Sequence, residues 1–60
     1  MNYRIPNDPY MLLSYINMML RDRYSSLEEF CLVNDADISE INAKLNAEGF
    51  EYNEKLNQFR

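Results

Sequence analysis

The first long run of regularly spaced apolar residues begins after Asn-Asp-Pro near the N-terminus. Asp8 can accept hydrogen bonds from the free N–H groups of a helix start, and Pro9 is preorganised for the first helical position. At about 100° per residue, the apolar side chains of the next fifteen residues fall on one broad face. That face consists of Leu12, Leu13, Ile16, Met19, Leu20 and Tyr24. The pattern predicts a helix from Pro9 to about Tyr24 with this face in the core.

A second, shorter helix is predicted over Leu27–Val33. Ser26 and Glu29 form a capping box, in which Ser26 accepts from the third helical N–H and Glu29 reaches back to the N-cap. The inward face of this helix is expected to follow the i, i+3, i+4 spacing. It would consist of Leu27, Phe30 and Cys31.

A third helix should follow the break at Asn-Asp-Ala-Asp. Asp37 with Glu40 repeats the capping pattern, but Ser39 competes for the N-cap, so the start is open by about two residues. Gly49, the single glycine, suits the left-handed position after a helix, and Phe50 would fold back on the last turn as in a Schellman motif. The inward residues are expected to be Ile38, Ile41 and Leu45.

Residues 50–59 fit two structures. A fourth helix would align residues at i, i+4 and i+7, namely Tyr52, Leu56 and Phe59. A hairpin is indicated by the alternation of Phe50 and Tyr52 and by Asn53 and Asn57, which bracket a four-residue turn. We favour the hairpin. The N-terminal residues Tyr3 and Ile5 also alternate and can add a third strand.

These elements predict a mainly α fold: a three-helix, helix-turn-helix-like domain over residues 1–60, with the C-terminal hairpin as a wing. A chain of this length buries only about 60% of its unfolded surface, so its stability should be small. The expected core consists of Leu12, Leu13, Ile16, Leu20, Leu27, Phe30, Ile41, Leu45 and Phe50.

The composition leaves little catalytic chemistry. With one cysteine and no histidine, the chain can form neither an intrachain disulfide nor a Cys/His zinc or nucleophile site. Cys31, on an inward face beside acidic residues, is expected to be a buried small hydrophobe. The acids Asp35, Asp37 and Glu40 lack the central glycine and the twelfth-position glutamate of a calcium loop. We therefore expect no enzymatic activity, no metal, no cofactor and no small-molecule substrate.

The N-terminus has no uninterrupted apolar segment and no small-residue cleavage site, so it is not expected to be a signal peptide. The apolar run of the first helix is interrupted by Ser14 and Asn17 and is shorter than the roughly 20 residues of a membrane span. A cytoplasmic protein is therefore expected. The net charge is −4, and it is uneven, because residues 25–60 hold eight acids and three bases.

The first helix also carries Met11, Tyr15 and Met18 at i, i+4 and i+7, opposite its core face, and is therefore apolar nearly all round. The hairpin and the N-terminal strand can wrap over this second face. Alternatively, Met and Tyr together are typical of an interface, either with a second copy of the chain or with another protein. A membrane-surface helix ranks third, because it would need Lys and Arg along a polar face. We expect a protein–protein interaction module that can self-associate.

The alternative function is a DNA-binding regulator of the winged helix-turn-helix type. Such domains present their second short helix to the major groove, and its outward residues here would include Asn42, Lys44 and Asn46. Affinity for DNA, however, depends on neutralising phosphates with Lys and Arg. Residues 25–60, with eight acids against three bases, oppose that binding.

Two segments, PNDPYMLLSYINMMLRDRYSSLEEFC and GFEYNEKLNQFR, resemble a family of short bacterial proteins catalogued as a domain of unknown function. The resemblance covers nearly the whole chain and is strongest at residues 6–14 and 49–59. It implies a complete, single-domain cytoplasmic protein. The family has no assigned activity, cofactor or substrate, so the resemblance implies no site residues.

Overall fold

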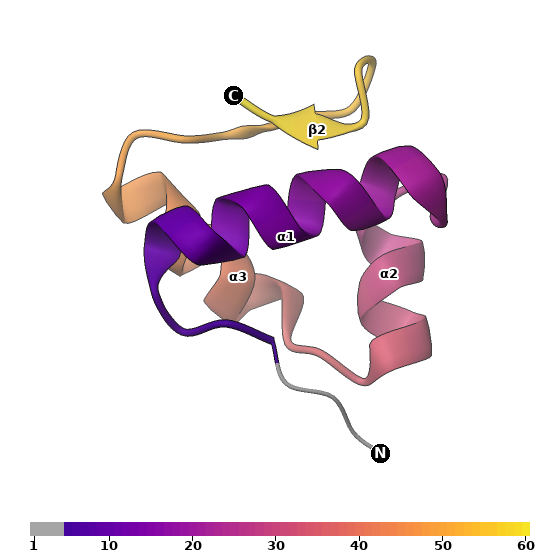
Figure 1. Cartoon of the computed structure of the whole chain (residues 1–60), viewed down its shortest axis with the longest axis horizontal. Coiled ribbons are helices and arrows are strands. Elements are labelled where there is room, and N and C mark those ends of the chain that lie inside the picture. Colours follow the sequence, from indigo (N-terminus) through magenta and orange to yellow (C-terminus); the bar gives the residue numbers. More distant parts are fainter. Residues whose placement is uncertain (1–4) are drawn as a thin grey trace.

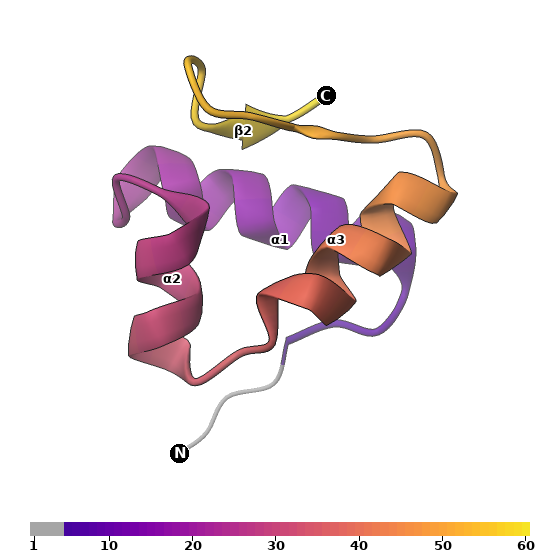
Figure 2. The ribbon, with the colours of Figure 1, turned by 180° about the vertical axis from the view of Figure 1, so that it is seen from behind.

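Three short helices and a two-stranded hairpin make up the protein (Figure 1). The structure is a computed structural model that describes residues 5–60. In chain order, the elements are α1 (Pro9–Asp22), α2 (Leu27–Asn34), α3 (Ile38–Ala47), β1 (Tyr52–Asn53) and β2 (Gln58–Phe59). Helix α1 lies between the hairpin on one side and α2 and α3 on the other (Figures 1 and 2). The predicted mainly α fold is confirmed, and the tail is the hairpin rather than a fourth helix.

Each helix begins where a side-chain oxygen satisfies its first free N–H groups. The carboxylate of Asp8 accepts from the N–H groups of the second and third residues of α1, and Ser26 accepts from the N–H of Glu29 at 3.0 Å. At α3 the carboxylate of Asp37 accepts from the N–H of Ser39 at 2.9 Å. Asp37 is therefore the N-cap of α3, and Ser39 lies inside the helix.

The capping box of α2 differs in one detail from the predicted pattern. The carboxylate of Glu29 accepts from both the backbone N–H and the hydroxyl of Ser25, each at 2.8 Å, rather than from the N–H of Ser26. These hydrogen bonds lower the pKa of Glu29 below its ordinary value of 4.5. Helix α1 also ends at Asp22, two residues earlier than expected, and Tyr24 lies in the connection to α2.

Helix α3 ends as predicted in a Schellman motif. Gly49 has a φ of 91°, the N–H of Phe50 donates to the carbonyl of Leu45 at 2.9 Å, and the N–H of Gly49 donates to Asn46 at 3.0 Å. Helix α2 ends in the same way, with Asp35 at a φ of 54°. A left-handed residue thus terminates each of these two helices and turns the chain.

The hairpin pairs Tyr52 with Phe59 and Asn53 with Gln58 in an antiparallel register. The side chain of Asn53 accepts from the N–H of Leu56 at 3.0 Å and so closes the turn between the strands. The sheet has two strands among the described residues. The expected third strand is not formed at Ile5, which lies outside any strand and packs against the core, and Tyr3 falls outside the described residues.

The core lies where α1 meets the other elements. Its buried side chains are Leu12, Ile16, Leu20, Leu27, Phe30, Cys31, Ile41, Leu45 and Phe59. Leu13 and Phe50, which were expected in the core, are only partly buried at its edge. Phe59 was missing from the expected core. It is buried because β2 packs directly against α1, a contact between residues far apart in the sequence.

Candidate functional site

Two asparagine side chains hold the hairpin against α1. Asn17 accepts a hydrogen bond from the N–H of Phe59 at 2.8 Å and donates to its carbonyl at 3.1 Å, as a neighbouring strand would. The amide group of Asn57 donates to the carbonyls of Leu20 and Tyr24 at 3.1 and 3.0 Å. The carbonyl of Leu20 lies in the last turn of α1, where helices leave acceptors unpaired, and that of Tyr24 lies in the connection to α2. Asn57 therefore fixes the hairpin turn at this end of the helix.

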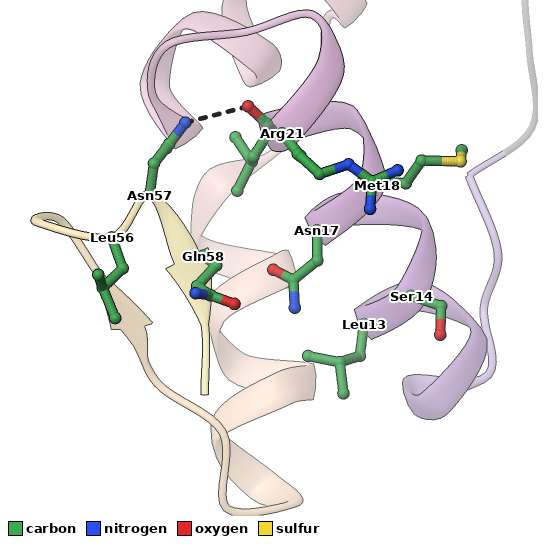
Figure 3. A pocket seen from close by; sticks show the side chains of 9 residues that line it. Leu13, Ser14, Asn17, Met18, Arg21, Leu56, Asn57 and Gln58 are labelled. Atoms are coloured by element: carbon green, nitrogen blue, oxygen red, sulfur yellow. Dashed lines mark hydrogen bonds between the residues drawn. The ribbon is translucent and has the colours of Figure 1, made fainter.

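An open groove of about 640 Å³ runs between α1 and the hairpin (Figure 3). Its lining residues are Leu13, Ser14, Asn17, Met18, Leu20, Arg21, Leu56, Asn57 and Gln58. Arg21 is the single ionisable side chain among these described residues, and it pairs with Asp22 at 3.0 Å. The groove can accept an apolar or hydrogen-bonding side chain, but these residues supply no general acid or base for catalysis at neutral pH.

The residues Met11, Tyr15 and Met18 do not form one open surface. Met11 is 63% exposed and Met18 is 43% exposed, whereas Tyr15 is half-buried. The ring of Tyr15 stands edge-on to Phe30, with centroids 6.2 Å apart. Tyr15 therefore packs at the edge of the core against α2. The hairpin instead brings Leu56, 49% exposed, to the groove that Met18 also lines.

The three candidate DNA-contacting residues of α3 lie on different parts of its surface. Asn42 is half-buried and lines a hollow beside Ser26 and Glu28, whereas Asn46 is exposed. The ammonium group of Lys44 donates to the side chain of Asn7 and lies 3.9 Å from a carboxylate oxygen of Glu40. At helical spacing, Lys44 is on the flank of α3 opposite Asn42.

A second exposed apolar surface was missed at the sequence level. Leu32 is 81% exposed and Val33 is 64% exposed on α2, on the side away from the core. The signal was present in the sequence, because both residues fall outside the i, i+3, i+4 face that begins at Leu27.

The remaining candidate groups are the Cys31 thiol and the acidic side chains of the described residues. Burial and, secondarily, the charge of Asp37 raise the pKa of the Cys31 thiol above its ordinary value, which disfavours the reactive thiolate. Residues 5–60 contain no group of three metal-ligating side chains placed to hold an ion. Within the same residues, no helix combines the length and apolar character needed to cross a bilayer.

The comparisons with known proteins bear on the whole chain rather than on one site. A family model described as a domain of unknown function, DUF4250, matches residues 6–59. The chain belongs to the DUF4250 family. The match extends from the residues before the α1 N-cap to Phe59, so it includes all three helices and the hairpin of this DUF4250 protein. Searches of the curated proteins and of the solved structures found no match.

Proposed function

We propose that this DUF4250 protein is a non-enzymatic protein-interaction module that self-associates through one side of α1. The observation that supports this is the exposure of Met11 and Met18 on α1, with Leu56 of the hairpin on the other side of the groove that Met18 lines (Figure 3). We call these three residues the methionine surface. Exposed methionine is common at interfaces, because its flexible side chain adapts to the shape of a partner.

A second copy of the chain is the proposed occupant because the charges around this surface balance. The charged residues at the two ends of α1 are two acids and two bases, namely Asp8, Arg21, Asp22 and Arg23. Two copies can therefore approach face to face without net repulsion, and a twofold axis would pair each methionine surface with itself. The α2–α3 side of the molecule is acidic, so two copies would repel each other there.

The geometry of the groove favours binding over catalysis. Two of its polar side chains, Asn17 and Asn57, are occupied in hydrogen bonds to backbone groups of the hairpin and of α1. They hold the surface in shape and are not available to move protons. An interaction module requires such a fixed surface and needs no catalytic group.

We test self-association by light scattering over a concentration series, with Met18→Glu as the interface variant. The substitution should leave the thermal midpoint within a few degrees of the wild type, since Met18 is partly exposed, and should abolish the dimer. Val33→Glu is the matched control, because Val33 is also an exposed apolar helix residue and lies on α2. We expect it to leave the dimer intact. A wild type that stays monomeric throughout, or equal loss in both variants, would overturn the proposal.

Tyr15 is a poorer position for this test. Its ring packs edge-on to Phe30, so Tyr15→Glu would place a charge at the edge of the core and destabilise the monomer. Loss of association in that variant could then come either from an unfolded monomer or from a disrupted interface. Met18→Glu avoids this ambiguity because the side chain lies on the rim of the open groove.

DNA binding is less well supported. Lys44, the one basic residue of α3, is held by Asn7 and faces the carboxylate of Glu40. A phosphate would have to compete with both of these groups for the ammonium. No other observation on α3 favours a nucleic-acid partner.

A further inference from the structure

Helix α2 exposes apolar side chains at its C-terminal end. Leu32 and Val33 are 81% and 64% exposed, although the opposite side of the same helix contributes Leu27, Phe30 and Cys31 to the core. In Figure 2, α2 and the turn that follows it lie on the side of α1 away from the hairpin. This region is therefore separate from the methionine surface.

A groove of about 500 Å³ lies between α2 and the start of α3, and we call it the α2 groove. Its lining residues are Glu28, Cys31, Leu32, Asp35, Ala36 and Ile38. Four of these are apolar, two are acidic and none of the described residues that line it is basic. An adjoining hollow shares Glu28 and Ile38 with it and adds the acidic Glu54. The apolar groove is thus bordered by carboxylates at several points.

The carboxylates around the α2 groove have no compensating charge nearby in the sequence. Residues 25–40, which comprise α2 and the connections on both sides, contain five acids and no Lys or Arg. The side chains of Glu28 and Asp35 have no ion-pair or hydrogen-bond partner within residues 5–60. These two carboxylates are therefore free to pair with cations on a bound molecule.

We propose that the α2 groove binds a basic amphipathic helix of a partner protein. The apolar stripe of that helix would pack on Leu32, Ala36 and Ile38, as helices do in hydrophobic grooves. Its Lys and Arg side chains would pair with the surrounding carboxylates. The same carboxylates repel a second copy of this surface, nucleic acid and an anionic membrane, which leaves a cationic apolar segment as the complementary occupant.

This inference goes beyond the proposed self-association, since it concerns a different surface and a different occupant. Met18→Glu would abolish the proposed dimer without touching the α2 groove. An experiment that refutes one of these two proposals therefore does not refute the other.

The probe is a synthetic helix of leucine and lysine, with leucines at the i, i+3, i+4 and i+7 positions. Its matched control keeps the leucines and replaces every lysine by glutamate. Binding to the full chain is followed by calorimetry and by backbone amide NMR. We expect the lysine helix to bind, the glutamate helix to fail, and the largest shifts to occur over residues 28–38. Raising the salt from about 0.05 M to about 0.5 M should weaken binding about tenfold or more.

Two variants locate the contact. Leu32→Ser should weaken binding of the lysine helix about tenfold, whereas Leu56→Ser, at an exposed leucine of the hairpin, should leave it unchanged. Glu28→Lys should also weaken it, through repulsion of the lysines. Both Leu32 and Glu28 are exposed, so the fold should persist, and thermal unfolding checks this.

Five results would overturn the proposal. The first four are absence of binding, equal binding of the glutamate helix, shifts that map to α1 instead of α2, and equal weakening by Leu32→Ser and Leu56→Ser. A concentration-dependent shift of the residue 28–38 amides without any peptide would assign the groove to a second copy, and so would overturn it as well.

Discussion

Asn57 joins three parts of the molecule through one side chain. Its amide group donates to the carbonyl of Leu20 in the last turn of α1 and to that of Tyr24 in the connection to α2, and its carbonyl oxygen accepts from the hydroxyl of Tyr52 at 2.6 Å. That hydroxyl in turn accepts from the N–H of Leu27 at 3.2 Å, at the start of α2. The backbone of Asn57 is left-handed, with a φ of 55°. Asparagine suits this position because it tolerates that conformation and carries both a donor and an acceptor.

Two substitutions separate these contributions at Asn57. Asn57→Gly keeps the backbone conformation and loses the side-chain hydrogen bonds, so the free energy of unfolding should fall by about 1–2 kcal/mol. Asn57→Ala loses the same hydrogen bonds but, unlike the glycine variant, keeps a β-carbon in the left-handed region, without the polar side chain that lets asparagine adopt it. It should therefore cost about 1 kcal/mol more than Asn57→Gly. Urea denaturation measures both. Asn46→Ala on exposed α3 is the control and should change little; equal stability of the glycine variant and the wild type would contradict the role given to these bonds.

The sequence pattern placed Phe50 in the core and omitted Phe59, whereas in the structure Phe59 is buried and Phe50 is only partly buried. Phe59→Ala should cost about 3–5 kcal/mol, because the ring is almost fully buried beneath β2. Phe50→Ala should cost about 1–2 kcal/mol, because this half-buried ring packs edge-on to Tyr10 at the rim of the core. Whole-domain stability at this length is only about 3–9 kcal/mol, so the first variant should be largely unfolded by circular dichroism. A larger loss in Phe50→Ala would contradict this ranking.

At the scale of elements, helix boundaries could be predicted from the sequence because they depend on local contacts. Asp8, Ser26 and Asp37 each bond an N–H within three residues, and Gly49 ends α3 through its own backbone conformation. A capping side chain and the N–H group that it bonds are close in the sequence, so a short segment is enough to predict the contact. The ambiguity between Asp37 and Ser39 remained because both side chains can accept the same N–H groups.

Contacts between distant elements were not predictable in the same way. The hydrogen bonds between the side chain of Asn17 and the backbone of Phe59 join residues 42 positions apart. An asparagine and a phenylalanine at this separation do not indicate such a contact. The sequence therefore indicated a hairpin but not which side of α1 it would cover. It covers the side of Leu13 and Asn17 and leaves Met11 exposed. For the same reason the periodicity of α1 could not reveal that Tyr15 packs against α2.

The start of α2 should be sensitive to acid. The pKa of Glu29 is lowered in the folded protein by its hydrogen bonds to Ser25, so the carboxylate stabilises the fold above about pH 4.5. That contribution is lost as the pH falls through the lowered pKa. Glu29→Gln should therefore reduce the free energy of unfolding at about pH 7, and the difference from the wild type should shrink by about pH 2.

Glu28→Gln is the matched control for this pH dependence. Glu28 lies in the same first turn, but its side chain has no hydrogen-bond partner within residues 5–60. Both substitutions remove one charge near the N-terminus of α2 and so lose a similar interaction with the helix dipole. A pH-dependent difference that is equal in the two variants would assign the effect to the dipole instead of Ser25.

At the scale of the whole molecule, charge is divided unevenly along the chain. Residues 1–24 contain three bases and two acids, whereas residues 25–60 contain eight acids and three bases. This division was readable from the sequence. Where the exposed apolar residues lie relative to it was not, because exposure depends on how the helices pack. Leu32 and Val33 lie on α2, in the acidic part of the chain, and Met11 and Met18 lie on α1, in the nearly neutral part. The methionine surface and the α2 groove therefore differ in the charge that surrounds their apolar residues.

The charge distribution leads to a prediction about DNA. We expect no sequence-specific binding of duplex DNA at physiological salt, because α3 offers a single base, Lys44, and that base already contacts Asn7 and Glu40. A selection over random duplexes, followed by gel shift, should enrich no motif. The control is Glu40→Lys, which removes one competing carboxylate and adds a cation. It should increase only weak, salt-sensitive binding without sequence preference. Enrichment of one motif with submicromolar affinity, reduced by Asn42→Ala or Lys44→Ala, would contradict the prediction and make α3 a recognition helix.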